Sequence, residues 1–252
     1  MIATAAIAKF GLLVVRPGVL VISTPIFGGA HIPVTVRIGL GLILAIVIAP
    51  VVPTPQSLGT VGLLVMVAGE VLVGVALGLA VAIVIAAAEL AGHLAGFQIG
   101  FSYAAVVDPQ SGVRNNVVAA LYGNLAMVTF LGINGHHNLV RALVGSYEAL
   151  PIGAVGVSGP IGGIVAHMLG LVLVTGTRLA APVVTALLLV EIVMGLIARA
   201  APQLNLLVVG TPVRLLVGML ALSAGIQVLP GVVTGATTPA FEAAIRLMRA
   251  FH

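Results

Sequence analysis

The residues that could do chemistry gather in one stretch of an otherwise apolar chain. Only 6% of the 252 residues are charged, yet the segment from Gly96 to Pro151 holds a group of ionisable side chains: Asp108, Arg114, His136, His137, Arg141 and Glu148. Polar groups are costly to bury without partners, so a mostly apolar protein that concentrates them has a use for them. We expect this stretch to be the functional centre.

Metal chemistry is one use of such residues. Glu89 and His93 lie four residues apart, which places them on one face of a helix, and His136 and His137 could join them around a metal ion. The stretch lacks the HExxH pattern and a third ligand at helical spacing. A hydrogen bond between Glu89 and His93 that stabilises packing is the simpler interpretation, and we predict no metal and no cofactor.

Proteolysis is a second possibility. Gly156-Val157-Ser158-Gly159 has the G-x-S-G form of intramembrane serine proteases, and His167 follows shortly after it. A nucleophile needs a rigid position and a base within hydrogen-bond reach, whereas Ser158 lies in a glycine-rich segment before Pro160. A linker is therefore the favoured interpretation.

Transport is the main alternative function. Glu70, Glu89 and Glu191, together with Arg178, could line the path of a polytopic small-solute or ion transporter, since ionisable residues within a membrane are functional by default. Secondary transporters usually also show an internal repeat with broken helices at matching positions. No convincing duplication is visible, and this alternative stays open.

A turn signature lies inside the functional stretch. Asp108-Pro109-Gln110-Ser111-Gly112 starts with an Asp before Pro and ends on Gly, and Asn115 or Asn116 can cap the helix that follows. The preceding GFSYAAVV is apolar, so we expect the loop to lie at membrane depth. Irregular backbone is tolerated there only where protein covers it or it lines a cavity, which indicates a pore constriction.

Composition places these residues in a membrane protein. Hydrophobic residues make up 61% of the chain and the mean hydropathy is +1.30, whereas soluble domains are 45–50% apolar and about 25% charged. The net charge of +4 comes from isolated basic residues between Lys9 and Arg249, which excludes a nucleic-acid-binding patch. Because Lys9 interrupts the first apolar run, we expect the N-terminus to be retained rather than cleaved as a signal peptide.

The N-terminal half contains four apolar runs. We expect Arg16-Pro17-Gly18 to separate the first run from the second, and three prolines to end the third run. The fourth would measure about 55 Å as one helix against a ~30 Å hydrocarbon core, so it must tilt, break or project from the bilayer. Within it, Gly74, Gly78 and Ala82 form a small-residue stripe that favours close helix packing inside the subunit. The runs are Ile2–Val15, Val19–Ile26, Ile38–Val52 and Leu58–Leu94.

Further helices are expected after Leu94. Pro182 and Pro212 are each expected near a helix start, and Ile152–Gly163 is expected to be a linker. With about six apolar segments able to approach a span, the chain is predicted to be all-α, a polytopic membrane-type protein of bent, proline-broken hairpins. After Leu94 the expected apolar segments are Val117–Ile133, Ile164–Thr175, Leu179–Ile197 and Leu206–Leu229. Two shorter segments are amphipathic: Asn138–Leu150 and the tail Pro239–His252, which has Arg246 and Arg249 on its polar side. The turn residues Arg199, Gln203, Asn205 and Arg214 are either solvated or form a subunit contact.

Three long motifs in register resemble the family of flagellar biosynthetic protein FliR and its injectisome counterparts in type III secretion. In order and spacing they extend over about half of the chain, from Gly96 to Leu222. They are GFQIGFSYAAVVDPQSG (Gly96 to Gly112), FLGINGHHNLVRALVGSYEALPIG (Phe130 to Gly153) and PVVTALLLVEIVMGLIARAAPQLNLLVVGTPVRLLVGMLAL (Pro182 to Leu222).

The resemblance implies a non-enzymatic, pore-forming subunit of the flagellar protein export gate. Such a subunit assembles with FliP-like and FliQ-like partners, meets FlhB-like and FlhA-like components, and passes unfolded export substrates across the bacterial inner membrane at the basal body. It also implies a FliP-like portion, residues 1–157, and a FliQ-like portion, residues 158–252. The partners expected are thus proteins and membrane lipid, with no nucleic acid.

The resemblance further assigns roles to residues. The loop from Phe101 to Asp108 is similar to the plug that closes the pore, with Asp108, Pro109 and Gly112 forming its turn. An apolar constriction excludes water and ions yet binds a passing chain weakly. We therefore expect Phe101, Tyr103, Val106 and Val107 to supply the seal, and His136, Arg141 and Glu148 to form a structural polar cluster.

Overall fold

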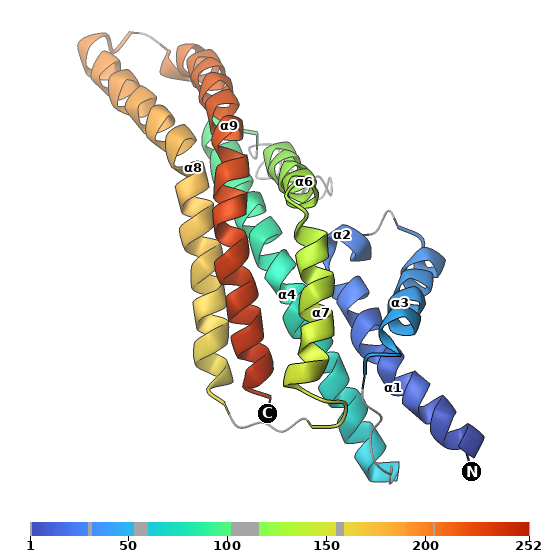
Figure 1. Cartoon of the computed structure of the whole chain (residues 1–252). Helices are drawn as coiled ribbons and strands as arrows, with labels where there is room; N and C mark the ends of the chain where they lie inside the picture. The colour runs from blue at the N-terminus through green and yellow to red at the C-terminus, as the bar shows by residue number, and fades with distance from the viewer. Residues whose placement is uncertain are drawn as a thin grey trace. The chain divides into compact units, whose positions relative to one another are not determined.

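The protein is built from helices, and its computed structural model describes residues 2–29, 32–52, 60–101, 116–154, 159–203 and 205–251 (Figure 1). No strand occurs within these ranges, which confirms the all-α prediction. A helix satisfies its own backbone hydrogen bonds, as an apolar chain requires. The helices are α1 (Ile2–Ser23), α2 (Pro25–Gly28), α3 (Val34–Ile48), α4 (Thr60–Ile99), α6 (Val117–Gly132), α7 (Gly135–Ala149), α8 (Ile161–Ala200) and α9 (Leu206–Arg249).

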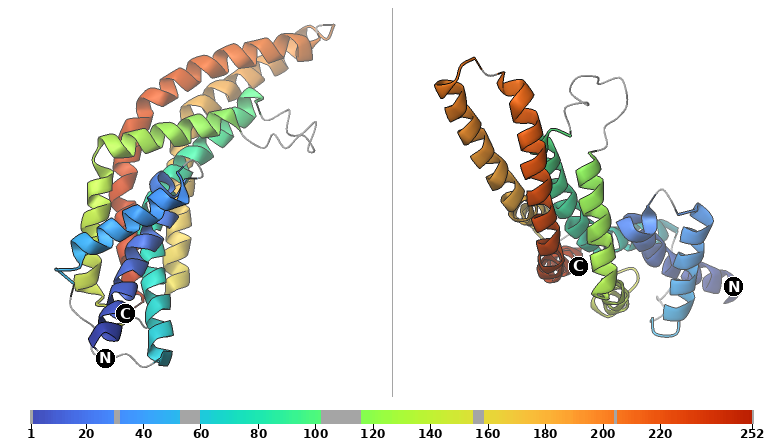
Figure 2. Two further views of the ribbon diagram at one scale, coloured as in Figure 1. Left: turned by 90° about the vertical axis from the view of Figure 1, so that its right-hand side faces the viewer. Right: turned by 90° about the horizontal axis from the view of Figure 1, so that it is seen from above.

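The helices divide into two compact units. Unit 1 comprises Met1–Ile83, Leu131–Leu169 and Thr237–His252, and unit 2 comprises Val84–Phe130 and Gly170–Ala236. The long helices α4, α8 and α9 each contribute to both. Within unit 2, α8 and α9 run side by side in opposite directions as a hairpin, which both views of Figure 2 show.

The first helix continues through Arg16-Pro17-Gly18, so the break predicted there is wrong. Proline has no N–H and leaves the carbonyl four residues earlier without its helical donor, here the carbonyl of Leu13. The hydroxyl of Tyr147, on α7, donates a hydrogen bond of 3.3 Å to that Leu13 carbonyl. A donor from another helix therefore replaces the one that Pro17 removes.

Small residues let the helices of unit 1 approach closely. A Cβ atom on Gly74 would lie 2.9 Å from the Arg16 carbonyl oxygen and from Val19, and one on Gly78 would collide with Ser23, so both glycines face α1. Gly41 of α3 likewise packs on Gly18, where a Cβ atom would lie 3.1 Å from its Cα. The predicted role of Gly74 and Gly78 in packing within the subunit is confirmed.

The longest apolar run forms one unbroken helix. α4 has 40 residues, or about 60 Å at 1.5 Å per residue. Because α4 is continuous, the predicted alternative of a break at a glycine is excluded. The two other predicted alternatives remain: the helix tilts in the bilayer or it projects out of it. Since Gly74 and Gly78 lie against α1, they provide close contact rather than a hinge.

The last two helices are also longer than predicted. The segments 164–175 and 179–197 join into the 40-residue α8, which places Pro182 inside the helix rather than near its start. The segment 206–229 and the tail 239–252 belong to the 44-residue α9, so the tail is not a separate helix. Pro212 does fall near the start of α9, and Arg246 and Arg249 are exposed at its end, as expected.

By length and composition, three of the described helices could cross a membrane, and the α6–α7 pair could supply a fourth crossing. They are the segments 62–99, 161–200 and 208–249. Only 17% of the most apolar window of α8 is buried within the chain, against 67% for α4. α8 thus leaves most of its apolar surface for lipid or for other chains to cover.

Candidate functional site

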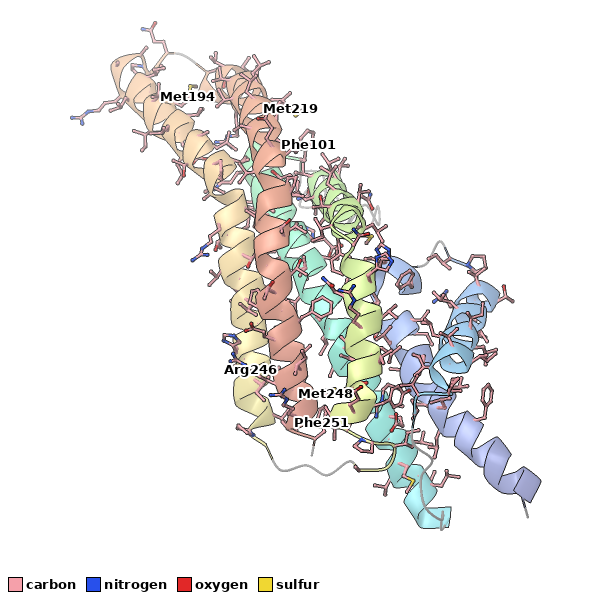
Figure 3. The ribbon with its side chains drawn as sticks, in the orientation of Figure 1. Phe101, Met194, Met219, Arg246, Met248 and Phe251 are labelled. Carbon is pink, nitrogen blue, oxygen red and sulfur yellow. The ribbon has the colours of Figure 1, made fainter. Side chains whose placement is uncertain are left out.

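The predicted plug begins where α4 ends. Of its residues, Tyr103, Val106, Val107, Asp108, Pro109 and Gly112 lie outside the described residues. Phe101 is separated from the end of α4 by Gly100 alone (Figure 3), and 45% of its surface is exposed. Gly100 has a φ of 106°, which a side chain would disfavour, and the Phe101 amide donates to the Gly96 carbonyl at 2.9 Å. The chain therefore leaves α4 through a glycine terminator.

Asn116 starts the helix at the other end of that loop. Its Oδ1 atom accepts hydrogen bonds from the amides of Val118 at 3.0 Å and Ala119 at 3.3 Å. This is an N-cap, which satisfies donors that the first helical turn leaves free. The sequence offered Asn115 or Asn116 for this role, and the structure assigns it to Asn116.

The two ends of the loop are held together by glycines. A Cβ atom on Gly92 would collide with Ala119, and one on Gly96 would collide with the carboxamide of Asn116. The Nδ2 atom of Asn116 also donates to the His93 carbonyl at 3.4 Å. The C-terminal end of α4 and the N-terminal end of α6 thus form one tight stem for residues 102–115.

The predicted polar cluster of His136, Arg141 and Glu148 lies on α7. Arg141 and Glu148 are exposed, and neither hydrogen bonds nor ion pairs join the three side chains in the described part of the chain. The rings of His136 and His137 stack with centroids 4.2 Å apart. Asn134 just before them adopts a left-handed backbone with a φ of 57°, which separates α7 from α6.

The polar cluster that is buried was not predicted. The Nε atom of Arg16 donates to one Glu70 carboxylate oxygen at 2.7 Å, and Nη2 donates to the other at 3.0 Å. The remaining Arg16 donors reach the Ser146 hydroxyl at 2.8 Å and the Leu150 carbonyl at 3.1 Å. The guanidinium carbon also lies 4.0 Å from the ring centroid of Tyr147. This network joins α1, α4 and α7, and its signal in the sequence is an arginine between the first two apolar runs and a glutamate inside the fourth.

The predicted subunit-contact turn joins α8 to α9. Arg199, Gln203 and Asn205 are exposed, and the Asn205 carbonyl accepts from the amides of Val208 and Val209 at the start of α9. Arg214 forms an ion pair of 3.1 Å with Glu191, and both side chains are about 40% exposed. The structure therefore brings Arg214 to an acid on the opposite helix.

The residues of the alternative functions are dispersed. Glu70 is engaged by Arg16, whereas Glu89 and Glu191 are exposed. No hydrogen bond joins Glu89 to His93, and no group of three potential metal ligands occurs among the described residues. Ser158 lies outside those residues. Of the three glutamates proposed for a transport path, only Glu70 is buried.

Comparison with known proteins gives consistent similarities. The model of the family described as bacterial export proteins, family 1, matches residues 7–239. The chain is 33% identical over 218 residues to the flagellar biosynthetic protein FliR of Pectobacterium carotovorum subsp. carotovorum, covering 86% of this chain and 83% of that one. It is 32% identical over 206 residues to FliR of Escherichia coli, covering 81% and 79%, and 31% identical over 220 residues to FliR of Bacillus subtilis, covering 84% of each.

Proposed function

Because the chain belongs to the bacterial export proteins of family 1 and is a membrane-embedded subunit of the flagellar export apparatus, we propose that it forms part of the export pore. The observation that carries this proposal is the stem made by Gly92, Gly96 and Asn116. It supports an apolar loop on two packed helix ends, as a constriction requires. In this role the protein is structural and catalyses no reaction.

The loop between the two helix ends is the proposed seal. Phe101, Tyr103, Val106 and Val107 present apolar side chains to the pore, and Asp108, Pro109 and Gly112 make the turn that returns the chain. A shut apolar ring excludes water and ions, while its weak, sequence-independent contacts let an unfolded substrate pass. The exposed position of Phe101 at the end of α4 supports this assignment.

The proposed partners are the other subunits of the gate. In this proposal residues 1–157 take the place of a FliP-like subunit and residues 158–252 that of a FliQ-like hairpin, in the inner membrane at the basal body. FlhB-like and FlhA-like components bind the assembly, and the turn of Arg199, Gln203, Asn205 and Arg214 contacts a neighbouring subunit. The large exposed apolar surface of α8 supports extensive coverage by other helices or lipid.

The test is co-expression of this chain with the FliP-like and FliQ-like subunits of the same organism. After purification in mild detergent, native mass spectrometry should show a discrete complex that holds this chain beside several copies of the others. A chain that remains alone and monodisperse would contradict the proposal. Transport assays on Glu70, Glu89 and Glu191 would then be the next step.

A further inference from the structure

An open groove of about 500 Å³ runs between α7 and the C-terminal end of α9, within unit 1. The α7 side of the groove is lined by the small residues Ala142, Gly145 and Ala149, and the α9 side by Phe241, Ile245 and Met248. Figure 3 shows Met248 in the last turns of α9. The floor is therefore mostly apolar, and the α7 wall presents short side chains beside Asn138 and Arg141.

Two arginines also line this groove. Arg141 projects from α7 and Arg249 from the last turn of α9, and neither forms an ion pair with any described residue. The one acid in the groove, Glu242, lies 3.7 Å from Arg246, which lines a separate hollow beside His167. The groove thus combines an apolar floor with two guanidinium groups that have no carboxylate of their own.

The α7 wall has room for a close neighbour. A Cβ atom added to Gly145 would meet no atom within 4 Å. Spaced small residues with open space above them allow another helix to approach its backbone closely, and polar groups across such contacts add specificity. Gly145 differs in this respect from Gly74 and Gly78, because α1 already occupies the space next to those two glycines.

From these features we infer that the groove receives an apolar helix of another subunit, and that this helix carries a carboxylate opposite Arg141. A helix laid on the floor would remove both arginines from water, which is unfavourable unless the helix supplies the opposite charge. A phospholipid could offer its phosphate to Arg141, but flexible acyl chains gain nothing from short side chains at Ala142, Gly145 and Ala149, which bring a helix backbone close. The inference rests on the proposed function, because it needs an assembly of several chains.

The test uses the co-expressed assembly described above, with three single variants of this chain. Gly145→Leu adds a bulky side chain to the wall at a position where the Cβ atom itself meets nothing within 4 Å, and Arg141→Glu places like charges together. Arg246→Gln is the control, because Arg246 is exposed on the same helix end as Arg249 but lies outside the groove, and glutamine places no like charge beside Glu242. We expect at least a roughly tenfold loss of recovered complex for the first two variants and little change for the control.

A photo-crosslinking residue at Ala142 identifies the occupant. The inference requires a crosslink to an apolar helix of another subunit, and charge reversal of the acid in that helix should restore assembly with Arg141→Glu. A crosslink to phospholipid, or full assembly of both groove variants, would overturn it while leaving the proposed function intact. Failure of the unaltered chain to assemble would instead remove the proposed function itself.

Discussion

Arg16 and Glu70 form an ion pair of 2.7 Å in which both side chains are completely buried. The pair joins α1 to α4, and Arg16 extends the link to α7 through Ser146 and the Leu150 carbonyl. Removing two charges from water offsets much of their attraction, so such a pair contributes less to stability than to the choice of one arrangement. Glu70 therefore fixes how three helices meet rather than serving as a free group for transport.

Breaking this pair on one side is expected to be costly. Glu70→Leu leaves the Arg16 charge buried without a carboxylate and should lower the free energy of unfolding by about 3–5 kcal/mol. The double variant Arg16→Met/Glu70→Leu should recover most of that loss, because no charge then remains in the apolar site. Denaturant titration of the chain in detergent measures both values.

The exposed pair of Glu191 and Arg214 provides the comparison. Both of its side chains are about 40% exposed, so Glu191→Leu should change the free energy of unfolding by at most about 1 kcal/mol. Equal losses from Glu70→Leu and Glu191→Leu would show that burial of the first pair has no energetic consequence.

The hydroxyl of Tyr147 should matter because of Pro17. Tyr147→Phe leaves the Leu13 carbonyl buried without a donor, which should cost about 1–3 kcal/mol in the same titration. Tyr122 is the matched control, since its hydroxyl is fully buried and has no hydrogen-bond partner in the described part of the chain. Tyr122→Phe should be neutral or stabilising. A larger loss of unfolding free energy from Tyr122→Phe than from Tyr147→Phe would refute the role of Tyr147 as the donor that replaces the N–H missing at Pro17.

The continuity of α1 shows what the sequence could not predict. Arg16-Pro17-Gly18 is a strong local signal for a helix end, and local rules alone would place a break there. The compensating donor is Tyr147, 134 residues away from Leu13. Only tertiary packing brings the two together, just as it brings Glu70 to Arg16.

The helix content and the cap at Asn116 could be predicted, because both depend on composition or on neighbouring residues. Apolar content fixed the all-α membrane class, and Asn before an apolar run predicted a helix start. The union of 164–175 with 179–197 was missed because Arg178 and Pro182 interrupt the apolar pattern. A helix of 40 residues tolerates both when its other turns remain hydrogen bonded.

The stem of the proposed plug makes a prediction about glycine. A Cβ atom on Gly92 would lie 2.7 Å from the Val118 carbonyl oxygen, so Gly92→Ala should push α6 from α4 and destabilise unit 2 by about 1–3 kcal/mol. Gly170→Ala is the control, because its Cβ atom would meet nothing within 4 Å and alanine favours helix by up to about 1 kcal/mol. Hydrogen exchange at the start of α6 should increase only for Gly92→Ala. Equal exchange in both variants would argue against the stem.

Ion leakage tests the seal itself. In cells that hold the assembled gate, Tyr103→Gly/Val106→Gly should raise ion conductance, because removing two side chains opens an apolar constriction to water. Asn116→Ala should raise it less, since it loosens one end of the loop by about 1 kcal/mol while keeping the apolar residues; Asn116→Asp should restore the N-cap but not the hydrogen bond to the His93 carbonyl, because a carboxylate cannot donate. Ser158→Ala changes no residue of the proposed seal and should leave both conductance and motility unchanged. If the double glycine variant conducts no more than the unaltered gate, Tyr103 and Val106 do not close the pore, and the apolar barrier lies elsewhere in the gate.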